Sequence, residues 1–293
     1  MIMDDGISDL AKKIKNSFYA RKKTYANKAW SFYKEQRSRF KRIGYPSFYL
    51  WILGCQRSGT TLLERIFRQD LDSAVFGEFS ELTIGTKRTV LKPFAEIKDI
   101  LLCCNARYAV IRPLFESDRV CEILDFFQPS LGIWMFRDPL YVVNSMINKW
   151  GDDFFEISRH VETGSDGQWR LENLYVSIKK EAKELTGTDK RIEDLYALYW
   201  LKRNEFTTNH LLSKNHQILF LNYALLASNP KHCTDTILIR AGQTGVWKYF
   251  NSDAHTFSLN RKLTLSITPK IYDQCNSFYH AMLRLGERDF SGR

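Results

Sequence analysis

The chain has 293 residues, of which 44% are hydrophobic and 26% are charged, a composition typical of a folded globular protein. No apolar run approaches the roughly 18 residues that a membrane-spanning helix needs, and the N-terminus lacks the apolar core of a signal peptide. The six cysteines show neither a C-x-x-C pair nor a metal-ligand spacing. We therefore expect a reduced, cytoplasmic protein.

The net charge of +10 is concentrated near the N-terminus, where residues 1–46 carry twelve Lys or Arg against four Asp or Glu. Apolar residues from Leu10 to Phe40 recur on one side of a helix. This pattern predicts a basic amphipathic helical segment at 1–46 beside an α/β domain at 47–293. Two roles of the segment stay open: packing on the domain, or peripheral contact of residues 10–42 with an anionic membrane or an acidic polymer. We expect no nucleic-acid partner, because no nucleic-acid motif accompanies the basic face.

Strand and helix patterns alternate along the rest of the chain. In chain order, we predict a strand at 48–54, a helix that begins at the loop after it, a strand at 73–79, a helix at 86–104, a strand at 107–113, a helix at 116–127, a strand at 131–139, and then helices at 139–150 and 191–212 and a strand at 216–223. This alternation predicts an α/β fold with a P-loop-type, doubly wound parallel sheet of about five strands flanked by helices. Ligands of such sheets bind beyond the carboxyl ends of the strands. The groups that follow these ends are residues 54–61, 77–81, 112–113 and 137–145.

The segment GCQRSGTT at 54–61 has the spacing of the phosphate loop G-x-x-x-x-G-K-[ST], but Thr60 replaces the lysine. Its glycines let backbone N–H groups point inward, and the helix that follows adds a partial positive charge. Arg57 and Ser58 supply further donors. Because the lysine that reaches the β- and γ-phosphates is absent, we expect this loop to hold an anion other than a nucleoside triphosphate.

Arg137 lies at the end of the fourth strand, and Ser145 follows eight residues later on a helix. With the RSGTT loop, this spacing resembles the sulfotransferases that use 3′-phosphoadenosine 5′-phosphosulfate (PAPS), in particular their bacterial, Golgi and tyrosylprotein-type branch. The resemblance implies two anion sites. The 5′-phosphosulfate would be held by Arg57, Ser58, Gly59, Thr60 and Thr61, and the 3′-phosphate by Arg137 and Ser145.

Two later segments add to the resemblance. LFLNYALLASNP is similar to the family's strand ending in YEDL…P, which implies that Tyr223 lies near the adenine, although Ala224 and Leu225 replace the acidic residues of that motif. RAGQTGVWKYF resembles the glycine-rich segment that closes over the nucleotide. The nucleotide-binding residues implied there are Gly245, Trp247 and Lys248.

A base must take the proton of the acceptor hydroxyl during sulfuryl transfer. In relatives, a glutamate just beyond the second strand is implied for this role, so we expect Glu78 to serve, with Glu81 in reserve. Alternatively, one of them caps a helix or pairs with Arg57. Arg112 is expected to steady the bridging oxygen or an acidic acceptor, or else to pair with Glu116 or Asp118.

The sequence thus indicates an enzyme that transfers a sulfuryl group in line from PAPS to a hydroxyl or amine. The acceptor class stays open among carbohydrate, glycolipid, peptide and small metabolite. The expected location is cytoplasmic, with peripheral contact at a membrane left open. We expect no metal, because Asp138, the nearest candidate ligand, belongs to an Arg-Asp-Pro turn. Two alternatives stay open: a P-loop kinase or other nucleotide-binding enzyme, and a non-catalytic binder of acidic glycan or lipid.

Overall fold

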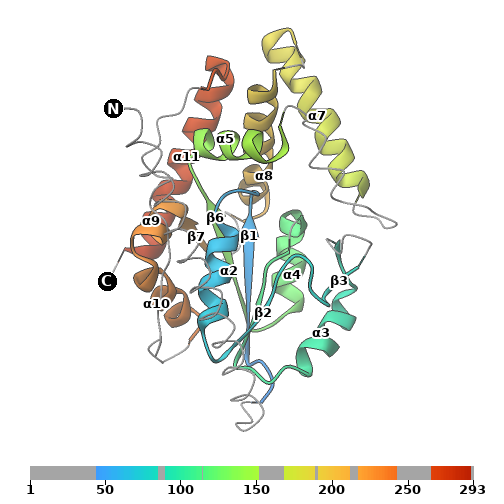
Figure 1. Ribbon diagram of the computed structural model, residues 1–293, viewed down its shortest axis with the longest axis vertical. Helices are drawn as coiled ribbons and strands as arrows, with labels where there is room; N and C mark the ends of the chain where they lie inside the picture. The colour runs from blue at the N-terminus through green and yellow to red at the C-terminus, as the bar shows by residue number, and fades with distance from the viewer. Residues whose placement is uncertain are drawn as a thin grey trace, which may run out of the picture. The chain divides into compact units, whose positions relative to one another are not determined.

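The computed structural model describes residues 44–84, 90–113, 115–151, 168–188, 191–211, 217–242 and 265–291. A parallel sheet of five strands runs through it in the order β2-β5-β1-β6-β7 (Figure 1). These strands are β1 (Phe48–Gly54), β2 (Ser73–Phe76), β5 (Tyr108–Ile111), β6 (Ser130–Phe136) and β7 (Ile218–Asn222). The predicted α/β class is therefore confirmed, and the strand ends differ from the predicted ends by up to three residues.

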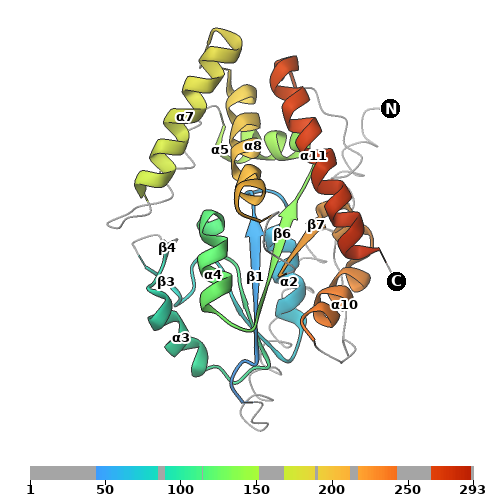
Figure 2. The same ribbon diagram turned by 180° about the vertical axis from the view of Figure 1, so that it is seen from behind.

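Helices cover both faces of this sheet (Figures 1 and 2). The helices of the described residues are α2 (Thr60–Gln69), α3 (Phe94–Leu102), α4 (Val120–Phe126), α5 (Pro139–Trp150), α7 (Gln168–Thr186), α8 (Ile192–Leu211), α9 (Tyr223–Ser228), α10 (Pro230–Arg240) and α11 (Pro269–Phe290). Of these, α7 packs on α8 beyond the sheet. Leu50 and Ile52 of β1 pack against α2 and α10. Trp51 and Leu53, on the opposite face, pack against α4, α8 and α11. Every residue of β1 and β6 is buried, as expected for strands covered on both faces.

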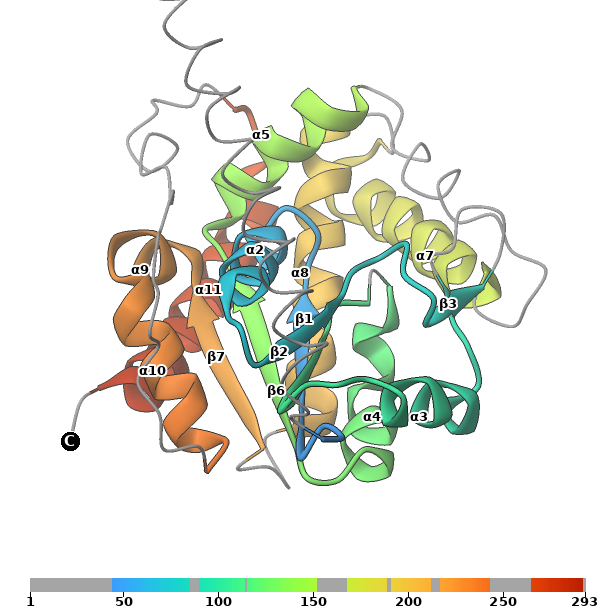
Figure 3. The same ribbon diagram turned by 60° about the horizontal axis from the view of Figure 1, so that its bottom comes forward.

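The direction of the connections changes beside β1. From β1 the chain passes through α2 to β2 on one side, whereas from β6 it leads to β7 on the other. The carboxyl ends of β1 and β6 are adjacent, with Gly54 opposite Met135. This pair of strand ends is therefore the switch point of the sheet, where ligands bind in doubly wound folds. Helix α5 crosses the same end of the sheet and packs on α8 (Figure 3).

One predicted helix is wrong in its first part. Instead of a helix from residue 86, the chain forms a small antiparallel sheet of β3 (Thr83–Ile84) and β4 (Val90–Leu91), and α3 begins only at Phe94. Pro93 immediately precedes α3. A proline disfavours helical backbone at the residue before it, so the helix starts after the proline. The predicted helix at 116–127 likewise begins as a short 3-10 turn, η1 (Glu116–Arg119), before α4.

Several predictions fall partly outside the described residues. Residues 1–43, which include most of the predicted basic segment, are among them, so its structure and its partners stay predictions.

All six cysteines are described, and all are free thiols. Within the described ranges, no helix has the length and apolar character needed to cross a membrane.

Candidate active site

The loop between β1 and α2 turns through three residues with positive φ: Gly54 at 125°, Arg57 at 67° and Gly59 at 99°. A Cβ at Gly54 would lie 2.2 Å from the carbonyl oxygen of Met135, so only glycine fits beside β6. Arg57 holds a left-handed conformation that costs a non-glycine residue about 1 kcal/mol. Strain of this kind is commonly found where a side chain must be aimed at a ligand.

The beginning of α2 is built to receive an anion. Gly59 is the N-cap and supplies no side-chain cap, while the backbone N–H groups of Leu62 and Leu63 both donate to the Gly59 carbonyl. The hydroxyl of Ser58 is fully buried and has no hydrogen-bond partner among the described residues. A helix N-terminus with a buried, unused donor beside it suits an oxyanion. The loop residues predicted for the phosphosulfate therefore fit such a group.

A hydrogen bond joins the two predicted anion sites directly. Arg57 Nε donates to the Ser145 hydroxyl at 2.9 Å, across 88 residues of sequence. Arg57 belongs to the loop after β1, whereas Ser145 lies on α5, which follows β6. The structure thus brings together the loop and the Arg137–Ser145 segment at the switch point, as the sequence predicted.

Arg137 lies between aromatic rings at the end of β6. Its guanidinium carbon is 4.3 Å from the ring centroid of Tyr223 and 5.3 Å from that of Tyr141. Burial lowers the pKa of Arg137, and the nearby charge of Arg57 lowers it further, while Tyr223 and Asp138 act in the opposite direction. Two guanidinium groups that are close enough to repel each other create a positive electrostatic potential, which favours binding of an anion between them.

Tyr223 contacts both halves of the site. Its Cδ2 lies 2.4 Å from the position that a Cβ on Gly59 would take, and its ring faces Arg137. It is the first residue of α9, whose N-cap Asn222 accepts a hydrogen bond from the Ala224 backbone at 2.7 Å. The ring is therefore held at the switch point by the end of β7.

Glu78 and Arg112 meet in an ion-pair network. The Arg112 guanidinium donates through Nε to Glu64 and through Nη1 to Glu78, and Arg68 donates to Glu64 at 2.8 Å. Arg112 and Glu64 are almost fully buried, whereas the Glu78 side chain is 20% exposed. Burial alone raises the pKa of Glu64, but Arg112 and Arg68 outweigh this effect and lower it. The network fixes one oxygen of Glu78, while Oε2 takes no part in the ion pair.

The alternative partners expected for Arg112 are wrong. Glu116 instead pairs with Arg119 and accepts a hydrogen bond from the Leu91 backbone at 3.2 Å. Sequence reasoning missed Glu64 because it lies in the interior of α2, and only the packing of that helix on β1 and β2 brings it to Arg112. Glu81 is exposed. Burial raises the pKa of the Cys104 thiol to about 11, and the charge of Glu81 adds to this effect. Of the two glutamates, Glu78 is therefore the one tied to the strand-end network.

Helix α8 supplies contacts that the sequence analysis did not predict. The Tyr199 hydroxyl donates to Gln56 Oε1 at 2.7 Å, and Trp200 Nε1 donates to the Arg137 carbonyl at 3.2 Å. Residues 194–201 of this helix are all buried, so this part of the helix has no face exposed to solvent. Its nearly continuous apolar and aromatic composition is the signal that separates a buried helix from a surface one.

Three predicted nucleotide-binding residues, Gly245, Trp247 and Lys248, lie in 243–264, outside the described residues. Thr60 and Thr61, predicted for the phosphosulfate, are the first two residues of α2. Asp138 accepts a hydrogen bond from the Leu140 backbone at 2.8 Å and so caps α5. Within the described part of the chain, no group of three or more His, Cys, Asp or Glu side chains is arranged to hold a metal ion.

Comparisons with known proteins find only distant likeness. Neither a protein-family model nor a curated protein matches the sequence. The sulfotransferase domain of the Synechococcus PCC 7002 olefin synthase is 13% identical, with a TM-score of 0.46 over 80% of this chain and 96% of that domain. The sulfotransferase domain from the curacin biosynthetic pathway is 14% identical, with a TM-score of 0.44 over 82% of this chain and 99% of that domain. Sulfotransferase STF9 from Mycobacterium avium is 10% identical, with a TM-score of 0.41 over 89% of this chain and 79% of its own.

Proposed function

We propose that this protein is a sulfotransferase that takes a sulfuryl group from PAPS and passes it to a hydroxyl or amine. One observation carries the proposal: the hydrogen bond between Arg57 and Ser145, which makes a lysine-less phosphate loop and a second basic segment into one site. Residues 54–61 and residues 137–145 are the two anion-binding arms of this site. A donor with phosphate groups at both its 5′ and 3′ positions matches these two arms. A triphosphate, with its charge on one side of the ribose, engages only the loop.

In this proposal the loop and α2 hold the 5′-phosphosulfate through backbone N–H groups and through the side chains of Arg57, Ser58 and Thr61. Arg137 and Ser145 bind the 3′-phosphate. Tyr223 supplies an aromatic face for the adenine, since its ring already lies between the loop and Arg137. Gly245, Trp247 and Lys248 would close over the nucleotide.

Glu78 acts as the base, accepting the acceptor proton on Oε2 while Arg112 holds Oε1. The acceptor oxygen or nitrogen forms a bond to sulfur as the bond from sulfur to the leaving phosphate oxygen breaks, so that 3′,5′-adenosine bisphosphate leaves with the bonding pair. Arg57 and the N-terminus of α2 stabilise the charge that grows on that oxygen. No step in this scheme needs a metal ion.

We further propose that the acceptor is a carbohydrate, glycolipid or peptide. Residues 10–42, with their basic composition, would bring the protein to an anionic membrane or an acidic polymer. We propose a cytoplasmic location, with residues 10–42 in peripheral contact with the membrane.

Calorimetry with 3′,5′-adenosine bisphosphate, 5′-AMP and ATP, each with and without magnesium, tests the proposal. We expect magnesium-independent binding that depends on the 3′-phosphate and weakens in Arg137→Ala. Preference for ATP with magnesium would instead identify a kinase-like enzyme. If no nucleotide binds, but acidic glycan or lipid binds in a salt-dependent way that survives Arg57→Ala and Glu78→Ala, the protein is a non-catalytic binder.

A further inference from the structure

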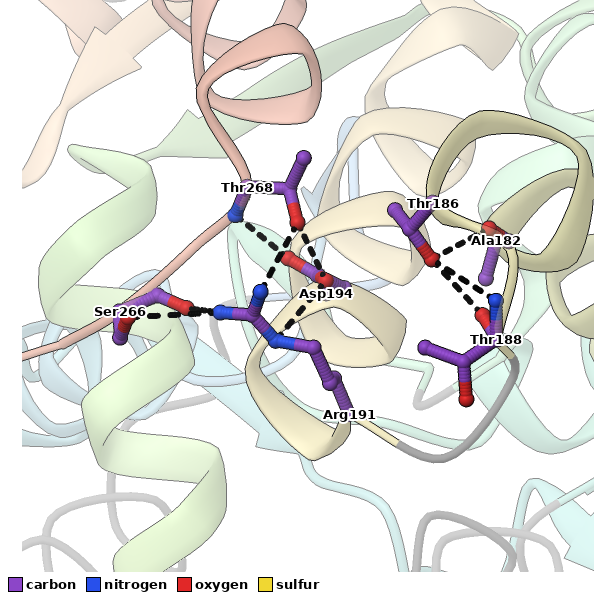
Figure 4. A network of polar contacts seen from close by, with 7 residues as sticks. All are labelled: Ala182, Thr186, Thr188, Arg191, Asp194, Ser266 and Thr268. Carbon is purple, nitrogen blue, oxygen red and sulfur yellow. Dashed lines mark hydrogen bonds and ion pairs between the residues drawn. The ribbon is translucent and has the colours of Figure 1, made fainter.

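Helix α8 is anchored firmly at its first turn. The carboxylate of Asp194 accepts hydrogen bonds from the Thr268 backbone at 2.7 Å and from the Thr268 hydroxyl at 2.8 Å (Figure 4). Arg191 pairs with the same carboxylate and donates to the Ser266 carbonyl. Asp194 is only 1% exposed, so this contact is shielded from water. The start of α8 is thus tied to the chain that leads into α11.

About one and a half turns further along, two consecutive residues of α8 reach different loops. Tyr199 donates to Gln56, in the loop that holds Arg57, and Trp200 donates to the carbonyl of Arg137 itself. Both side chains are fully buried. Each hydrogen bond spans at least 63 residues of sequence, so neither is a local contact.

We propose that α8 sets the separation between the two anion-binding arms, and that Tyr199 and Trp200 are positioning residues for a ligand that spans both. This inference rests on the proposed function and deepens it. A ligand with two phosphate groups gains affinity from two sites only when their separation matches its own. A ligand with one phosphate needs only one arm, and is indifferent to that separation.

The hydrogen bonds of Tyr199 and Trp200 differ from the other contacts that connect the two arms. The Arg57–Ser145 bond and the Tyr223 ring involve side chains that bind the ligand themselves, and they can rearrange when it arrives. Tyr199 and Trp200 instead act on Gln56 and on a backbone carbonyl, which are not proposed to touch the ligand. Their loss should therefore change the geometry of binding without removing a ligand contact.

Calorimetry on Tyr199→Phe and Trp200→Phe tests this inference, with 3′,5′-adenosine bisphosphate and 5′-AMP as the two probes. Each variant should weaken binding of the bisphosphate about fivefold, the effect of one lost hydrogen bond, and change binding of 5′-AMP less than twofold. Matched controls are Tyr196→Phe and Trp134→Phe. Tyr196 and Trp134 are also fully buried. Tyr196 donates to the Gly151 carbonyl at the end of α5, and Trp134 donates to Asn204 of α8, so neither hydrogen bond ends in residues 54–61 or 137–145.

The outcomes separate the inference from the proposed function. If the native protein binds the bisphosphate but both variants weaken the two probes equally, α8 has only a structural role and the inference is overturned. Equal losses in the control variants would overturn it as well. If the native protein does not bind the bisphosphate, the proposed function fails, and the inference fails with it.

Discussion

The Tyr223 ring packs so closely on Gly59 that no larger residue fits there: a Cβ would lie 2.4 Å from Cδ2 of the ring. Gly59→Ala should therefore displace Tyr223 and destabilise the fold by about 2 kcal/mol or more, through overpacking and positive-φ strain together. Bisphosphate binding should fall in parallel. Urea unfolding and calorimetry measure the two effects.

Gly44→Ala is the control for this change. Gly44 has a φ of 102°, nearly the same as the 99° of Gly59, but among the described residues beyond its chain neighbours no atom lies within 4 Å of its Cβ position. Its substitution should show the strain alone, about 1 kcal/mol. Equal destabilisation by both changes would contradict the role that we give to the Tyr223 contact.

Arg57 is a non-glycine residue with a φ of 67°, so its backbone is strained. We expect Arg57→Gly and Arg57→Ala to lose bisphosphate binding to the same degree, because both remove the guanidinium. Arg57→Gly should nevertheless be more stable than Arg57→Ala by about 1 kcal/mol, since glycine adopts a φ of 67° without strain. Thermal unfolding of the two variants measures the difference, and equal stabilities would show that the loop relaxes when Arg57 is replaced.

Glu64 should make stability depend on pH in the acid range. Its pKa is lowered below the ordinary 4.5, so the stabilisation is fully present above that value and is lost as pH falls through the lower native pKa. Glu64→Gln should remove this dependence and cost about 3 kcal/mol at neutral pH, because buried Arg112 loses a partner. Urea midpoints from about pH 3 to 7 report both effects. Glu184→Gln, in an exposed pair with Lys180, should cost less than about 0.5 kcal/mol.

Glu78→Gln should separate binding from chemistry. If Glu78 is the base, bisphosphate affinity should stay within about twofold of the native value, while sulfuryl transfer falls about 10²-fold or more. Release of 3′,5′-adenosine bisphosphate from PAPS in the presence of acceptor measures the rate. Glu81→Gln should leave the rate unchanged, and a larger loss in that variant would transfer the role of base to Glu81.

The sheet and the loop were predictable because their signals are local. A continuous apolar run such as residues 48–54 has few alternatives to a buried strand, and the spacing of Gly54 and Gly59 has a direct backbone reason. The proximity of Arg57 and Ser145 followed from topology, since these residues come after β1 and β6, and the carboxyl ends of parallel strands lie at the same end of the sheet.

The supporting contacts were not predictable in the same way. Which partner Arg112 selects depends on how α2 packs on β1 and β2, and Glu116 and Asp118 are nearer in sequence than Glu64 and Glu78, with which Arg112 pairs. The buried hydroxyl and indole of α8 look like ordinary core residues until their acceptors, in loops at least 63 positions away, are known. Side-chain pairing across distant elements is set by packing, which no sequence period encodes.

Helix α11 also covers one edge of the sheet and so limits its pairing with strands of other chains. Strand β7 ends the strand order, yet its Phe220 N–H donates to Asp289 at 2.9 Å, and Gly286 packs against the Phe220 carbonyl. A foreign strand added at this edge would first have to displace α11. We therefore expect an added strand to pair at the opposite edge of the described sheet, where β2 has four residues.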